Sequence, residues 1–194
     1  MPELVEETPV RPDLDAAGVA EDLRRRVEGE VLFDAIHRTL YSTAACIYQI
    51  MPLGAVVARH EGDVLAVLDY ARQNRIPITA RGGGSGLAGQ TLGRGIVLDF
   101  SKHFQGIADI DAARGTVRVQ PGVVQARLNR VLRRHGMHFA PDPPSAPWCT
   151  VGGMLANNAG GSHTVKRGAT RENTVSVRVA LADGTVIDTE ALPP

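Results

Sequence analysis

The sequence predicts an α+β protein made of two small α/β subdomains. Between residues 55 and 100, strand, helix and strand patterns follow one another, and a loop then leads to a further strand. A second group, strands and one helix, begins near residue 106. Each group contains one glycine-rich stretch. A chain of 194 residues is long enough for two such units that share a core.

Composition and charge narrow the class of protein. Apolar residues make up 43% of the chain, and 21 Lys and Arg balance 21 Asp and Glu, so nothing favours nucleic acid or an anionic membrane as partner. No apolar run is long enough to cross a membrane, and the acidic N-terminus lacks a signal-like run. The two cysteines have no metal spacing. We expect a cytoplasmic protein, and association with a membrane through a partner stays open.

The first group of elements reads as a small, mostly parallel sheet. One or two amphipathic helices are expected between residue 18 and about residue 40, after an extended start. A strand at 55–59 precedes a helix at 63–74, which Asp63 is placed to cap. Two further strands are expected at 76–80 and 95–100.

The second group begins with a hairpin, 107–111 and 116–120, and a helix over 123–135. Residues 140–173 are polar and are expected to be mostly irregular. Two strands that turn at Asp183-Gly184 follow. The expected division is an N-terminal helical extension (1–40), subdomain 1 (41–105) and subdomain 2 (106–194), the last incomplete. Its open strand edge would favour a homodimer.

The first glycine-rich stretch, ARGGGSGLAGQT, runs from Ala80 to Thr91. It contains G-x-G-x-x-G, but only QTLGR separates it from the next strand, so the helix of a dinucleotide fingerprint is missing. It is not a Walker A loop either. Consecutive glycines expose backbone N–H groups that can bind an anion such as a phosphate. The alternative is a flexible linker, which Arg81, Leu87, Gln90 and Thr91 make less favourable.

The second stretch, TVGGMLANNAGG, runs from Thr150 to Gly161. Gly152-Gly153 could begin a helical turn whose N–H groups point at an anion or a polar ring edge. The alternative is a long loop that contains a turn. Two backbone-rich stretches from two subdomains suggest one elongated ligand lying between them.

Other chemical signals are weak. The six histidines are scattered, so no metal site is expected. Ser145 and Cys149 lack a local base, which leaves nucleophilic catalysis without support. Trp148 is expected to pack in the interior, although it could cover the edge of a cofactor.

The two stretches, with VQPGVV and PDPPSAPWC between them, resemble the FAD-binding domain of FAD-linked oxidases, the PCMH or vanillyl-alcohol oxidase type. The resemblance covers about residues 38–190 and looks closest to the branch of glycolate, D-lactate and D-2-hydroxyglutarate dehydrogenases. It implies a PCMH-type FAD-binding domain of two α/β subdomains, truncated at its C-terminal side. The cofactor-binding residues that it implies are Gly82, Gly83, Gly84, Ser85, Gly86, Leu87, Gln90, Thr91, Pro141, Asp142, Ser145, Thr150, Gly152, Gly153, Asn157, Gly160, Gly161 and Val179.

Two departures from the family pattern matter. Ser85 stands where members that bind FAD covalently have a histidine, which implies non-covalent FAD. Arg167 precedes Gly168 where relatives often have an aromatic residue, which puts that local contact in doubt.

The implied reaction is oxidation of a small D-2-hydroxy acid by hydride transfer to the flavin. The electron acceptor stays open, no catalytic residue is assigned, and an iron–sulfur cluster is implied only for a C-terminal part outside this sequence. The chain alone is expected to be inactive. The alternatives are a non-catalytic FAD-carrying subunit and a module for another nucleotide.

Overall fold

A four-stranded sheet organises the first half of the chain. The computed structural model describes residues 15–189. The strands are β1 (Glu30–Leu32), β2 (Gly54–Val57), β3 (Ile78–Arg81) and β4 (Ile96–Asp99), in the spatial order β1-β2-β4-β3. β4 lies between β2 and β3 and is parallel to both, while β1 is antiparallel to β2. The predicted mostly parallel sheet is confirmed, and its central strands β2 and β4 are buried along their whole length.

Three helices belong to this half: α1 (Ala16–Arg24), α2 (Ala35–Tyr41) and α3 (Glu61–Asn74). Of the one or two helices expected between residue 18 and about residue 40, two are present, and the strand β1 that separates α1 from α2 was not expected. Pairing with β2 explains the difference: the chain enters β1 at Gly29, where an added Cβ would overlap the carbonyl oxygen of Val57. Tertiary pairing therefore overrides the local helical pattern.

Asp63 does not cap α3, contrary to expectation. The helix begins two residues earlier, and His60 is the N-cap, with its Nδ1 accepting from the Asp63 N–H. The Asp63 carboxylate is only 1% exposed and accepts hydrogen bonds from the N–H groups of Glu28 and Arg59, both at 2.8 Å. It thus joins the segment before β1 to the segment before α3.

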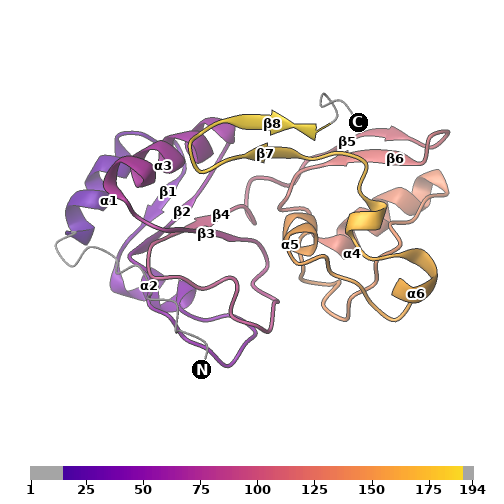
Figure 1. Ribbon diagram of the computed structural model, residues 1–194, viewed down its shortest axis with the longest axis horizontal. Helices are drawn as coiled ribbons and strands as arrows, with labels where there is room; N and C mark the ends of the chain where they lie inside the picture. Colours follow the sequence, from indigo (N-terminus) through magenta and orange to yellow (C-terminus); the bar gives the residue numbers. More distant parts are fainter. Residues whose placement is uncertain (1–14, 190–194) are drawn as a thin grey trace, which may run out of the picture.

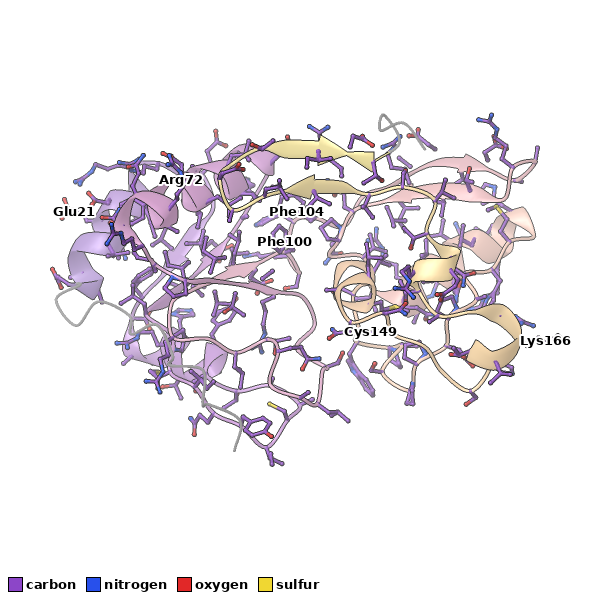
Figure 2. All side chains as sticks on the ribbon, in the orientation of Figure 1. Glu21, Arg72, Phe100, Phe104, Cys149 and Lys166 are labelled. Atoms are coloured by element: carbon purple, nitrogen blue, oxygen red, sulfur yellow. The ribbon has the colours of Figure 1, made fainter. Side chains whose placement is uncertain are left out.

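The second half starts with the predicted hairpin and helix. The hairpin consists of β5 (Ile107–Asp111) and β6 (Thr116–Val119), and α4 (Gln125–Leu132) continues into a short 3₁₀ helix, η1 (Arg133–His135). A small core around Val123, Leu128 and Leu132 holds α4 against the hairpin. A larger core fills the first half, where the sheet packs against α1 and α3. The rings of Phe100 and Phe104, labelled in Figure 2, meet edge to face at 5.2 Å after β4.

The polar region 140–173 is more ordered than expected. It forms α5 (Val151–Ala156), α6 (Thr164–Arg167) and a 3₁₀ turn, η2 (Arg171–Asn173). Only the helical turn at Gly152-Gly153 was expected. These helices have three to six residues, too few for an apolar period to be visible in the sequence.

The last two strands, β7 (Arg178–Ala180) and β8 (Val186–Asp188), form the predicted antiparallel hairpin. Figure 1 shows this hairpin running along one side of the molecule, from the α3 region towards β5 and β6. The Arg178 guanidinium donates to both carboxylate oxygens of Glu61, at 3.1 and 2.9 Å, and Ala180 packs against the larger core. The C-terminal hairpin is therefore attached to the first half of the chain. Within residues 15–189, no helix is both long and apolar enough to span a bilayer.

Candidate functional site

The first glycine-rich stretch leaves a row of backbone donors free. It follows β3 directly, and among residues 15–189 no acceptor takes the N–H groups of residues 83–87. Five consecutive N–H groups without a protein partner are unusual, because buried or half-buried amides are normally bonded. Such a row forms the concave donor surface that binds anions.

The backbone of Gly84 fixes the shape of this row. Its φ is +63°, the left-handed region that favours glycine, and an added Cβ would lie 2.7 Å from Nη2 of Arg81. The Gly84 carbonyl accepts a hydrogen bond from the N–H of Ala45 at 3.0 Å. Residues 43–45 therefore hold the stretch from one side.

Arg81 braces the start of the stretch. Its Nη2 donates to the carbonyl of Thr43 at 2.9 Å, and its guanidinium lies 5.6 Å from the centroid of the Tyr41 ring. The Tyr41 hydroxyl in turn donates to the buried Asp99 carboxylate at 2.6 Å. Burial raises the pKa of Tyr41, and the bond to Asp99 raises it further, so the phenol stays protonated. Nη1 of Arg81 is buried and has no partner within the described residues.

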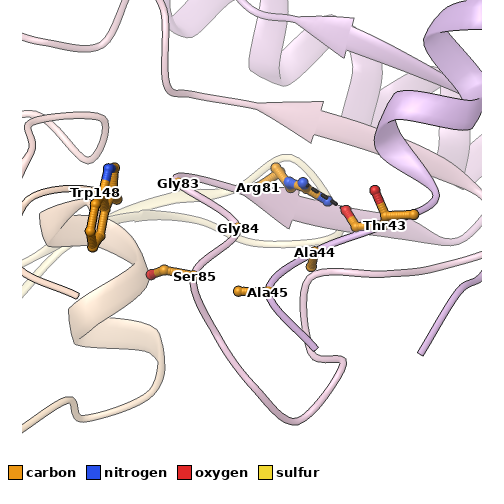
Figure 3. A pocket seen from close by; sticks show the side chains of 8 residues that line it. All are labelled: Thr43, Ala44, Ala45, Arg81, Gly83, Gly84, Ser85 and Trp148. Atoms are coloured by element: carbon orange, nitrogen blue, oxygen red, sulfur yellow. Dashed lines mark hydrogen bonds between the residues drawn. The ribbon is translucent and has the colours of Figure 1, made fainter. Parts of the chain in front are cut away.

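A pocket of about 350 Å³ opens beside this row of donors. Figure 3 shows Arg81 directed at Thr43, with Trp148 across the pocket beyond Gly83. Trp148 is 66% exposed, so the expectation that it packs in the interior is wrong. Arg81 is the one charged residue that lines the pocket, which gives it the electrostatics of an anion site. The lining consists of Thr43, Ala44, Ala45, Arg81, Gly83, Gly84, Ser85 and Trp148.

The structure brings the two glycine-rich stretches into contact. An added Cβ at Gly82 would overlap Oγ1 of Thr150, and one at Gly83 would overlap the carbonyl oxygen of Trp148. Farther along, the Gln90 side chain donates through Nε2 to Oδ1 of Asn157 at 2.9 Å. The two stretches therefore touch at Gly82 and Thr150, while Gly83 contacts Trp148 just before the second stretch, and the pocket lies beside these contacts.

The first backbone donors of the second stretch form hydrogen bonds with the segment that precedes α4. The N–H of Val151 donates to the carbonyl of Val123 at 2.8 Å, and that of Gly152 donates to the carbonyl of Pro121 at 2.9 Å. The prediction that the N–H groups at Gly152-Gly153 point at an anion is therefore wrong for Gly152, whereas the Gly153 N–H has no acceptor among the described residues. An added Cβ at Gly152 would lie 2.5 Å from Cβ of Pro121, so this glycine permits close packing. Oγ1 of Thr150 is buried and has no partner among the described residues.

The other predicted residues surround this junction. Asp142 accepts a hydrogen bond from the N–H of His163 at 3.2 Å and pairs through its second oxygen with Nδ1 of that histidine, which keeps the pKa of Asp142 below its usual value. Gly161 packs against the carbonyl of Asp142. Val179 lies on β7 opposite Ile187, away from the residues that line the pocket.

The remaining predicted positions divide into exposed and covered ones. Leu87 is 75% exposed, whereas Oγ1 of Thr91 is buried without a described partner. Gly86 leaves room for the Gln90 amide, and Gly160 for Thr164. The carbonyl of Pro141 accepts a hydrogen bond from the side chain of Gln125, and the carbonyl of Gly153 accepts one from the side chain of Asn157. The carbonyl of Ser145 accepts from the N–H groups of Trp148 and Cys149.

Cys149 lies between the two stretches and its side chain is buried. Burial raises the pKa of its thiol, which keeps it protonated near neutral pH.

Sequence reasoning missed the wall formed by Thr43, Ala44 and Ala45, and the contact through which Arg81 braces it. Residues 41–52 have no helix or strand period, and small uncharged side chains give no chemical signal. The contact from Arg81 to Thr43 spans 38 positions, so it depends on the fold.

Comparisons with known proteins agree on the kind of domain. The family described as "FAD binding domain" matches residues 52–190. D-2-hydroxyglutarate dehydrogenase of Escherichia coli (strain K12) is 36% identical over 168 residues, which cover 85% of this chain and 16% of that protein. Glycolate oxidase subunit GlcD of the same organism is 34% identical over 177 residues, or 89% of this chain and 35% of that protein. The chain thus spans well under half of each relative.

Solved structures show the same fold. Alkyldihydroxyacetonephosphate synthase matches with a TM-score of 0.80 and 19% identity, over 98% of this chain and 37% of that chain. The 6-hydroxy-D-nicotine oxidase of Arthrobacter nicotinovorans matches with a TM-score of 0.71 and 26% identity, over 84% of this chain and 36% of that chain. The expected α+β architecture of a PCMH-type domain is confirmed.

Proposed function

Because the chain belongs to the family of FAD-binding domains, we propose that the row of free N–H groups at residues 83–87 binds the pyrophosphate of FAD. This row is the observation that carries the proposal. Backbone donors without a protein acceptor gain hydrogen bonds when an anion arrives, and charge on the acceptor strengthens them.

The surroundings of the row fit a dinucleotide with a charged centre. Nη1 of Arg81 and Oγ1 of Thr150 are buried polar atoms that lack partners, and both belong to residues at the junction of the two stretches. Among residues 15–189, none that lines the pocket carries a carboxylate that would repel a phosphate. Trp148 offers an exposed ring to the apolar part of such a ligand.

The parent reaction that these residues support is oxidation of a small D-2-hydroxy acid. FAD, when bound, supplies the hydride acceptor. The residues of this chain bind and orient it: residues 83–87 hold its anionic centre, Arg81 keeps them in place, and the side chain of Gln90 joins the two stretches. The relatives that support this substrate class are the D-2-hydroxyglutarate dehydrogenases and the glycolate oxidase subunit, and the chain covers only part of each.

Non-covalent attachment of FAD follows from Ser85. This side chain lines the pocket and is not a histidine, which is the residue expected at this position for a covalent bond. We place the protein in the cytoplasm and leave its electron acceptor, its oligomeric state and any iron–sulfur partner domain open. A FAD-carrying subunit without its own catalysis is the second candidate, since one relative is a subunit of a glycolate oxidase and the chain covers only 35% of it.

An activity assay tests the substrate class. The chain and a full-length parent protein are each incubated with FAD, a dye acceptor and D-lactate, glycolate or D-2-hydroxyglutarate. The parent should reduce the dye with one of these acids, and the chain alone should not. Reduction by the chain alone would show that it holds the catalytic groups. A parent that binds FAD yet oxidises none of these acids would favour the carrying subunit.

A further inference from the structure

The outer side of α4 and η1 carries an unusual concentration of positive charge. Residues 112–141 contain no Asp or Glu, although the chain as a whole is neutral. The same segment contains Arg114, Arg118, Arg127, Arg130, Arg133 and Arg134, together with His135 and His138, and all of these residues are exposed. Positive charge is therefore collected on one part of the second subdomain.

Four of these arginines lack carboxylate partners. No Asp or Glu within residues 15–189 lies within 4 Å of Arg127, Arg130, Arg133 or Arg134. Arg127 donates instead to the carbonyl of Gln105 at 2.7 Å. Elsewhere arginines do pair with carboxylates, as Arg25, Arg72 and Arg178 do. Other described arginines, such as Arg24 and Arg75, also have no carboxylate of the described residues within 4 Å, so the distinguishing feature of this helix is that residues 112–141 contain no Asp or Glu.

The spacing of these arginines places them on one face of α4 and η1. Leu128 and Leu132 point into the core, and Arg127, Arg130 and Arg134 follow one another at intervals of three and four residues. Positions with these intervals lie on the same side of a helix, where like charges repel each other. This repulsion is relieved when negative charge from outside covers the stripe.

A hollow of about 410 Å³ lies beside the stripe, lined by Gln125, Ala126, Asn129, Arg133 and His138. The two amide side chains are already bonded to backbone groups of Pro141 and Phe139. Arg133 uses only its Nε, which donates to the carbonyl of Asn129 at 3.3 Å. The donors that remain in the hollow belong to Arg133 and His138, and a guanidinium fork is suited to a carboxylate.

We propose that this basic face, formed by Arg127, Arg130, Arg133, Arg134 and His138, docks a partner protein through an acidic segment of that partner. One carboxylate enters the hollow, and others lie along the arginine stripe. A lipid surface fits less well, because both leucines of α4, Leu128 and Leu132, are buried, and the most exposed apolar side chains, such as Ile47 and Val165, lie on other segments. Nucleic acid fits less well because the chain as a whole has no net positive charge.

Fluorescence anisotropy with a labelled oligoglutamate peptide tests the proposal on the full chain. Wild-type protein should bind the peptide, and added salt should weaken binding. The double variant R130E/R134E should bind it at least about tenfold more weakly. The matched control K166E/R167E changes net charge by the same amount on the exposed helix α6 and should bind within about twofold of wild type. Thermal unfolding of each variant shows that it is folded.

Three outcomes would overturn the proposal. The first is equal loss of binding in both double variants, which would mean that only net charge matters. The second is equal binding by wild type and R130E/R134E. The third is an absence of peptide binding while phosphatidylglycerol vesicles or duplex DNA do bind, which would assign the face to another class of partner.

Discussion

The two glycine-rich stretches have similar compositions but use their backbones in opposite ways. In the first, the N–H groups of residues 83–87 have no acceptor within the described part of the chain. In the second, the N–H groups of Val151, Gly152 and Met154 all donate to carbonyl oxygens. Under the proposal above, the first stretch keeps its donors for a ligand, whereas the second uses most of its first donors to bond the segment before α4 and its own helix.

This difference shows that glycine has two separate roles in one site. Gly84 is required by its backbone angle, and Gly152 by the closeness of Pro121. Composition alone cannot distinguish the two roles, because both produce runs of glycine. Substitutions can distinguish them, since one role affects ligand affinity and the other affects folding.

The largest expected effect is on stability, from Gly152→Val. Gly152 is half-buried, and its added side chain would overlap the ring and backbone of Pro121; overpacking of this kind costs about 2 kcal/mol in the free energy of unfolding. Urea unfolding followed by circular dichroism measures the change. Gly115→Val serves as a control for glycine substitution where no atom lies within 4 Å of an added Cβ, although its φ of +68° adds strain of its own. A stable Gly152→Val variant would contradict the packing role.

Gly84→Val should act mainly on the ligand. The side chain would approach Arg81 and disturb the left-handed backbone, so affinity for FAD should fall by at least about tenfold, roughly 1.4 kcal/mol. Quenching of flavin fluorescence measures the affinity, and thermal unfolding shows whether the fold survives. Unchanged affinity would mean that the stretch is a linker.

Arg81→Lys should have a smaller effect on the same affinity. Lysine keeps the charge but loses the planar fork that contacts Thr43 and lies over Tyr41, so affinity for FAD should fall by about fivefold. Arg59→Lys, at an exposed position away from the pocket, should leave it unchanged. If both variants bind alike, the brace contributes nothing to the site.

The smallest expected effect concerns Asp142 and pH. Its pKa is lowered in the folded protein by His163, so the stability that it contributes is present above the unfolded value of about 3.9 and is lost as pH falls through the folded value. Asp142→Asn should therefore be less stable than wild type at neutral pH, and the two should converge in acid. Parallel thermal melts across this range measure it. A constant difference at every pH would contradict the role of the carboxylate charge.

Much of the fold could be predicted from sequence because its signals are local. Alternation and helical periods gave β2, α3, β3, β4 and the 107–119 hairpin, and the turn at Asp183-Gly184 gave the last hairpin. β1 could not be predicted, since it is a strand only through pairing with β2. α5 and α6 are too short to show a period.

The part of the site that could be predicted is the part in which a run of glycines indicates exposed backbone N–H groups. The stretch at residues 83–87 was found in this way, whereas the wall at residues 43–45 reaches the pocket only through tertiary contacts. The role of the Gly152 N–H could not be predicted. The sequence shows that a helix begins there, but it does not show that the carbonyl of Pro121 accepts the hydrogen bond.

The most direct test of the central claim compares three ligands on the same protein. The claim is that residues 83–87 bind the pyrophosphate, so ligands that carry it should bind and a flavin without it should not. Titration of the protein with FAD, ADP and riboflavin, followed by flavin fluorescence and by competition, should give FAD and ADP at least about tenfold tighter binding than riboflavin. Gly84→Val should remove most of that difference. Riboflavin binding as tight as FAD, or an absence of competition by ADP, would contradict the account.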